Sequence, residues 1–114
     1  MTRRTAAVTA ALCVLVVVAA GFRADAGAAA RKPVTHTVTI DAARFSPADL
    51  SVSVGDSIVW VNKDILAHTA TSSKPGFDSK VIAPGKSWRY TVRRKGEFPY
   101  TCVFHPMSAM LRVK

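Results

Sequence analysis

Short runs of alternating apolar and polar residues fill the sequence from residue 34 to residue 113. In the first run, Val34, Val38 and Ile40 share one face with His36, and threonines occupy the other face. Such alternation is typical of a β-strand with one buried face. Gly and Pro separate the runs, and no stretch has convincing helical periodicity. We therefore expect an all-β fold, an antiparallel β-sandwich of about eight short strands.

The N-terminal segment has the pattern of a secretory signal peptide. Arg3 and Arg4 form a basic start, an apolar run extends from Ala10 to Ala20, and Ala24-Asp25-Ala26 is a small-x-small cleavage site. A membrane anchor is the alternative, but the run is shorter than the roughly 20 apolar residues that span a bilayer. We predict that residues 1–26 are a cleaved signal helix. The protein would then be exported to the periplasm, the extracellular space or the cell wall, without stable membrane insertion.

Residues 27–33 are rich in alanine and basic residues and lack apolar periodicity, so we expect a disordered lead-in. The folded domain then spans residues 34–114, and we expect it to be a monomer. The whole chain carries a net charge of +9, which favours acidic protein partners or anionic cell-surface polymers. Nucleic acid is not expected as a partner, because the chain has neither a recognition motif nor a continuous basic helix.

Cys102 is the only cysteine after the predicted signal peptide. Exported proteins normally pair their cysteines in disulfides, so an unpaired thiol needs another role. His105 follows three residues later, two methionines come shortly after it, and His68 lies upstream. A thiolate, two imidazoles and a weak thioether are the ligands of a trigonal copper site. These residues therefore predict one copper ion held by His68, Cys102, His105 and a methionine.

Two other interpretations of these residues remain. Taken alone, Cys102 fits a buried free cysteine equally well. Zinc also binds short Cys/His pairs, but a structural zinc site takes four such ligands, and the one remaining histidine, His36, lies far away in the first predicted strand. A histidine near the end of a strand is typically a half-exposed residue rather than a ligand.

Further motifs, in order along the chain, match one family. They are Phe45-Ser46-Pro47, Val54-Gly55-Asp56, Trp60-Val61-Asn62-Lys63-Asp64 before His68-Thr69, Ala83-Pro84-Gly85-Lys86-Ser87, and Gly96-Glu97-Phe98-Pro99-Tyr100-Thr101-Cys102. On these residues the chain resembles the small blue-copper proteins of the plastocyanin, amicyanin and pseudoazurin family, the cupredoxins. The resemblance covers the whole mature domain. It implies an eight-stranded Greek-key sandwich with one type 1 copper near one end, held by His68 from one loop and by the other three ligands from a second loop.

The identity of the axial methionine depends on two patterns that disagree. Met110 lies five residues after His105, as the axial ligand does in plastocyanin and pseudoazurin. The family's axial methionine is followed at every second position by residues that face the core. Counted from Met107 these residues are Ala109, Leu111 and Val113, whereas counting from Met110 turns Arg112 and Lys114 inward. We predict Met107 as the axial ligand, with Met110 as the alternative.

Two positions depart from the family pattern. Many relatives carry Asn after the first histidine ligand and a hydroxyl residue after the cysteine, and the resemblance implies that these residues tie the two ligand loops together. Here the positions hold Thr69 and Val103. We therefore expect the side-chain tie to be missing or rebuilt. The backbone N–H of Thr69 can still contact the sulfur of Cys102.

The resemblance implies electron transfer, with one electron entering and leaving copper through the edge of His105. That edge would lie in an apolar patch with Leu66, Ala67, Pro106 and Met107, steered toward an acidic redox partner by lysines such as Lys63, Lys74 and Lys80. The alternative function is copper storage, delivery or tolerance with the same ligands, but a copper carrier would be expected to bring extra Met and His ligands. We do not expect an enzyme, because His36 alone cannot build a second copper site.

Overall fold

The computed structural model describes residues 31–73 and 76–114. The predicted signal helix, residues 1–26, lies outside the described residues, as do the first residues of the predicted lead-in. Residues 31–34 have no regular secondary structure and are exposed. Within the described ranges, no helix has the length and apolar character needed to span a bilayer.

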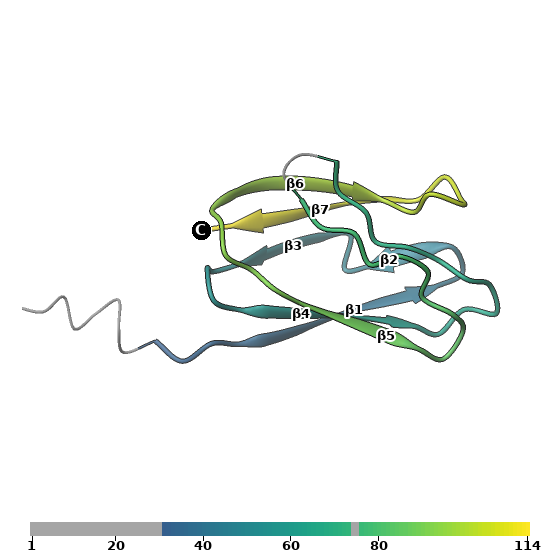
Figure 1. Cartoon of the computed structure of the whole chain (residues 1–114), viewed down its shortest axis with the longest axis horizontal. Coiled ribbons are helices and arrows are strands. Elements are labelled where there is room, and N and C mark those ends of the chain that lie inside the picture. The colour runs from purple at the N-terminus through teal and green to yellow at the C-terminus, as the bar shows by residue number, and fades with distance from the viewer. Residues whose placement is uncertain (1–30, 74–75) are drawn as a thin grey trace, which may run out of the picture. The chain divides into compact units, whose positions relative to one another are not determined.

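The described residues form two β-sheets and no helix, which confirms the all-β fold. One sheet has the order β2-β1-β4-β5 and the other the order β3-β7-β6. Figure 1 shows them as the two layers of a sandwich. The strands are β1 (Thr35–Asp41), β2 (Arg44–Ser46), β3 (Asp49–Val52), β4 (Ser57–Asn62), β5 (Ser87–Thr91), β6 (Gly96–Thr101) and β7 (Ser108–Val113).

The strand pairing is mixed. Antiparallel pairs join β1 to β2, β4 to β5 and β6 to β7. Two pairs are parallel, β1 with β4 and β3 with β7, because the chain changes sheet between the partners. Since β1 and β4 run side by side, Thr35 and Ser57 lie at one end of the sandwich, and Ile40 and Asn62 at the other.

In the connection from β4 to β5, the described residues 63–73 and 76–86 do not form the additional regular strands that their alternation suggests. This segment makes isolated bridges instead, from His68 to Ile82 and from Thr71 to both Asp78 and Thr101. A side chain interrupts the ladder, because the hydroxyl of Ser79 accepts a hydrogen bond from the amide of Ala70 at 2.8 Å. The described part of the chain therefore has seven strands, and the segment that carries His68 is held by bridges to its neighbours.

The core lies between the two sheets and is built from the apolar faces that the sequence predicts. Val38, Ile40 and Trp60 are fully buried. Aromatic rings pack around Trp60, with centroids 5.2 Å away for Phe77 and 5.6 Å away for Tyr100. At one end of the sandwich the core includes the buried side chains of Cys102 and Met107, so the predicted ligand loop packs directly on the core.

Candidate metal centre

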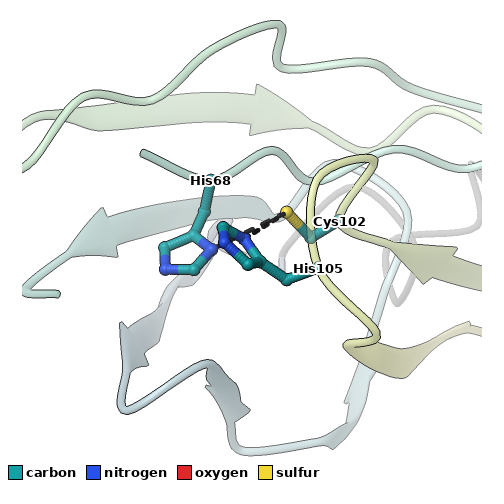
Figure 2. A group of neighbouring side chains, drawn as sticks. All are labelled: His68, Cys102 and His105. Carbon is teal, nitrogen blue, oxygen red and sulfur yellow. Dashed lines mark hydrogen bonds between the residues drawn. The ribbon is translucent and has the colours of Figure 1, made fainter. Parts of the chain in front are cut away.

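Three donor side chains meet at the end of the sandwich where β6 passes into β7. Nδ1 of His68 lies 3.7 Å from Sγ of Cys102, and Nδ1 of His105 lies 3.8 Å from the same sulfur. The three donor atoms all lie within 4.8 Å of one another. Figure 2 shows both imidazole rings turned toward the sulfur. His68 and Cys102 are buried, whereas His105 is partly exposed.

The spacing of these donors matches what a bound metal ion requires. In a trigonal arrangement, an ion about 2.1 Å from each nitrogen and about 2.3 Å from the sulfur separates the sulfur from each nitrogen by about 3.8 Å. The observed separations of 3.7 and 3.8 Å agree with that value. Because the donors already have this spacing, little rearrangement is needed to bind an ion. Within the described residues the cluster has three such donors, one fewer than a structural zinc site uses.

Backbone pairing and one buried side chain place His68. Its amide donates to the carbonyl of Ile82 at 3.1 Å, and its carbonyl accepts from the amide of Ile82 at 2.8 Å. Asn62 is fully buried at the end of β4, and its side-chain amide donates to the carbonyls of Leu66 and Ile82 at 2.8 and 2.9 Å. This single side chain therefore holds together the two segments between which His68 is fixed.

The orientation of the His68 ring is set by a carboxylate. Oδ2 of Asp64 lies 2.8 Å from Nε2 of His68, on the side of the ring away from Cys102. The same oxygen accepts a hydrogen bond from the amide of Ala43 at 3.0 Å. The Ala43 amide and then His68 lower the pKa of Asp64 to about 2. A carboxylate that binds one ring nitrogen directs the other nitrogen toward the metal.

The surroundings of Cys102 favour the thiolate form of its side chain. Burial raises its pKa, but the amides of Thr69 and Phe104 and the rings of His105 and His68 outweigh burial and lower the pKa to about 6. For His68, burial lowers the pKa, but Cys102 and Asp64 outweigh this effect, and the pKa of the ring is raised. The thiolate is the form that binds metal, so the site favours the ligand form of Cys102 at neutral pH.

Thr69 joins the two ligand loops. Its amide lies 3.4 Å from Sγ of Cys102, which confirms the contact predicted from the sequence. Its hydroxyl accepts a hydrogen bond from the amide of Val103 at 3.0 Å and another from the hydroxyl of Thr71, also at 3.0 Å. The tie between the loops is thus rebuilt, with one side chain bonding to the opposite backbone.

The two candidate methionines lie in different surroundings. Met107 is 5% exposed and lines a surface pocket together with Cys102 and His105. Its carbonyl accepts from the amide of Cys102 at 3.3 Å, so the ligand loop closes on itself. Met110 is a partly buried residue of β7 that pairs with Asp49 and Pro99. The sequence prediction of Met107 as the axial ligand is consistent with these positions and stays a prediction.

Both ligand loops carry exposed apolar side chains, and His105 itself is partly exposed. Leu66, which the sequence analysis expects in an apolar patch around His105, is 49% exposed, and Ile65 beside it is 88% exposed. On the other ligand loop, Val103 and Phe104 are 61% and 54% exposed. Of the other residues expected in this patch, Pro106 is exposed, whereas Met107 is buried. Large apolar groups are seldom this exposed together on a monomer unless the surface meets a partner.

His36 does not join the cluster. It lies near the start of β1, at the opposite end of the sandwich, and its Nε2 is 2.9 Å from Oδ2 of the buried Asp56. The sequence interpretation of His36 as a residue outside the metal site therefore agrees with its position.

Asp64 and Asn62 are the residues that sequence reasoning passed over as parts of the site. Both belong to the family motif Trp60-Val61-Asn62-Lys63-Asp64, but the sequence alone does not predict that either contributes to the site. The signal for Asp64 was its position four residues before His68, a spacing that allows a carboxylate to reach the ring when the intervening loop is compact. No local signal marked Asn62, because its two carbonyl partners come from segments that only the fold brings together.

A family model described as "Cupredoxin-like domain" matches residues 10–113. Among solved structures, the chain is similar to a copper-containing nitrite reductase from Thermus scotoductus SA-01, with 26% identity and a TM-score of 0.67 over 74% of this chain. The match covers 23% of that enzyme, so this chain spans about a quarter of it.

Two smaller proteins resemble the chain along most of their own length. A purple cupredoxin from Nitrosopumilus maritimus is 23% identical with a TM-score of 0.64, over 69% of this chain and 99% of that protein. An amicyanin variant in its Cu(I) form is 20% identical with a TM-score of 0.65, over 70% of this chain and 82% of that protein. At these identities the two likenesses concern the fold. With the family match and the three donors, the site fits one type 1 copper ion.

Proposed function

Because this chain belongs to the family of cupredoxin-like domains, we propose that it is an exported type 1 copper protein that carries single electrons between redox partners. One observation supports this most directly. The donors of His68, Cys102 and His105 stand at metal-binding separations, with the thiol favoured as thiolate. When bound, copper supplies a one-electron couple between Cu(I) and Cu(II).

The protein side chains hold the ligands still. His68 is fixed through Asp64, and the loop of Cys102 is tied to the loop of His68 by Thr69. Met107 is proposed as the axial ligand, because it is buried beside Cys102 and His105. A rigid ligand frame needs little reorganisation when the charge of the site changes, and this is the property that an electron carrier needs.

Electrons are proposed to pass through His105, the exposed member of the donor set. The rim of Ile65, Leu66, Val103 and Phe104 offers apolar contact around it. Of the lysines predicted to steer a partner, Lys63 is exposed, Lys80 pairs with Asp78, and Lys74 lies outside the described residues. Exposed Arg44 and Lys86 join Lys63 in favouring a partner with an acidic docking surface. The small area of the rim suits a brief encounter rather than a lasting complex.

The domain organisation belongs to the same proposal. Residues 1–26 would be a cleaved signal peptide, residues 27–33 a lead-in and residues 34–114 the copper domain, acting in the periplasm or outside the cell. A monomeric electron carrier is favoured over an enzyme, because the chain has only three histidines and His36 is bonded to Asp56 far from the cluster. Copper storage or delivery with the same ligands is the alternative.

The proposal is tested by adding Cu(II) to the purified protein and recording the visible spectrum. We expect an intense blue or purple thiolate-to-copper band at one equivalent, reversibly bleached by a mild reductant. The Cys102→Ser variant should bind copper without this band, whereas His36→Gln should keep it. A pale complex, or a band that does not return on reoxidation, would contradict the electron-transfer function and favour copper storage or delivery.

A further inference from the structure

The end of the sandwich opposite the metal centre gathers exposed basic side chains. We call this surface the basic pole and define it by Lys32, Arg93, Arg94, Lys95 and Lys114, all of which are exposed. Three of them are consecutive in the turn between β5 and β6, which lies with the C-terminal end of β7 in Figure 1. The six residue steps of β1 separate this end from the metal centre by about 20 Å.

One turn brings the basic segments together. Residues 53–56 link β3 to β4, and three distant chain segments form hydrogen bonds with this turn or the strand ends beside it. The amide of Val34 donates to Asp56 at 2.9 Å, the carbonyl of Val92 accepts from Gly55 at 2.8 Å, and the carbonyl of Lys114 accepts from Val54 at 3.2 Å. Lys32 precedes the first segment and Arg93 follows the second, so the charges surround one turn.

The carboxylate side chains near this end make their described contacts with residues outside the basic pole. Asp56 is buried and accepts hydrogen bonds from the amides of Val34 and Ser53 and from His36. Glu97 is engaged by Arg112, which also binds Asp49. Within the described part of the chain, no ion pair involves a side chain of the basic pole. Their charges therefore remain available to an external partner.

Apolar side chains lie among these charges. Val34 and Val54 are 46% and 41% exposed, and both belong to the segments that meet at the turn. A soluble polyanion gains nothing from exposed valines. The surface of an anionic bilayer uses both features, because headgroups attract Lys and Arg while the interface accepts apolar side chains.

We propose that the basic pole binds the surface of an anionic phospholipid membrane. Bound in this way, the protein presents the metal centre and the rim around His105 away from the lipid, where a partner can reach them. This interaction goes beyond the proposed electron transfer and requires no copper. Each basic residue near an anionic surface strengthens binding about fivefold, so removing three should weaken binding about 100-fold.

The test measures partition of the full chain onto vesicles of phosphatidylcholine alone and of equal parts phosphatidylcholine and phosphatidylglycerol. The pole variant is R93Q/R94Q/K95Q. Its matched control, R44Q/K63Q/K86Q, removes the same charge from exposed residues at the metal end. Residues 1–30 are common to all proteins, so any vesicle binding by their apolar run is the same background in every variant; binding to phosphatidylcholine vesicles measures this background, and it is subtracted. We expect the pole variant to bind the anionic vesicles about 100-fold more weakly and the control to lose much less.

Any one of the following results would overturn the proposal. Equal losses in both variants would mean that net charge alone matters, and equal binding to both vesicle types would remove the role of the anionic lipid. Dextran sulfate bound as tightly as vesicles, with V34S/V54S unchanged on vesicles, would assign the pole to soluble polyanions instead. If the pole variant is less stable than the wild type, the salt dependence of wild-type binding to anionic vesicles serves as the test. Binding that does not weaken with added salt contradicts the electrostatic attraction. The copper band should be the same in all variants, so failure here is distinct from failure of the electron-transfer proposal.

Discussion

The carboxylate of Asp64 lies 2.8 Å from Nε2 of His68 and 3.0 Å from the amide of Ala43, so one side chain joins the first hairpin to the metal centre. Through this contact the turn between β1 and β2 helps to orient a proposed copper ligand, although it contributes no ligand itself. The contact can be removed without touching any donor atom.

Replacing Asp64 by alanine should weaken copper binding about 10- to 100-fold, the usual cost of losing the partner that orients a histidine ligand. Competition with a chelator of known affinity would measure the change. Asp41→Ala is the matched control, since Asp41 is exposed and bonds only to the neighbouring amide of Ala42 among the described contacts. Equal affinity in the Asp64 variant and the wild type would show that the ring is held by the backbone alone.

Thr69→Val should loosen the ligand loops, because the amide of Val103 loses its 3.0 Å acceptor. We expect the free energy of unfolding of the metal-free protein to fall by about 1–3 kcal/mol, the cost of leaving a partly buried donor unpaired. Thr69→Ser keeps the hydroxyl and should restore most of the loss. Thr37→Val, on the exposed face of β1, should change little. Urea unfolding would compare the variants, and similar values for Val and Ser at position 69 would contradict the role of the hydroxyl.

The axial ligand can be identified with two leucine variants. Met107→Leu should shift the visible band and the reduction potential of the copper protein, because the buried thioether is replaced by an alkyl group of similar volume. Met110→Leu, on the partly buried face of β7, should leave both unchanged. Absorption spectra and voltammetry would report the outcome. A shift produced only by the Met110 variant would make Met110 the axial ligand.

The thiol of Cys102 should react as a thiolate down to mildly acidic pH. Its pKa is lowered from 9.0 to about 6, so the alkylation rate of the metal-free protein should be half-maximal near pH 6. The sign follows from the lowered pKa, since the reactive thiolate then persists as the pH falls from 9 to 6. Iodoacetamide labelling of a Cys13→Ser protein would follow Cys102 alone. In urea the midpoint should return toward 9, and an unchanged midpoint on unfolding would contradict the effect of the fold.

A glycine in the turn between β1 and β2 should stabilise the protein. Ala42 and Ala43 have φ angles of 49° and 54°, a conformation that disfavours residues with a Cβ atom. Ala43→Gly keeps the amide that binds Asp64 and should raise the free energy of unfolding by about 0.5–1 kcal/mol, after the entropic cost of glycine is subtracted. Ala48→Gly, at an exposed position outside the left-handed region, should lower it by about 0.4–1 kcal/mol. Denaturant unfolding that shows losses in both variants would contradict the strain at the turn.

The sequence predicted those features that depend on local pattern. The alternation from Val34 to Ile40 identified the buried face of β1, and the same alternation in β7 separated Met107 from Met110. The donor chemistry of Cys102 and His105 could also be predicted, because both belong to one loop. The mixed strand pairing could not, since parallel partners such as β1 and β4 are joined through another sheet and leave no mark in either strand.

By itself, the sequence determined which side chains face the core and which donor atoms are available to a metal. Tertiary structure decided how those donors meet. His68 and Cys102 are far apart in the chain, and their 3.7 Å separation depends on the pairing of Thr71 with Thr101 and on the two hydrogen bonds from Asn62. Side-chain type and strand period are local properties, whereas the distance between two loops is set by backbone pairing across the whole sandwich. For that reason the donor residues could be predicted from the sequence, whereas the loop contacts of Asp64 and of the Thr69 hydroxyl and the gathering of the basic pole could not.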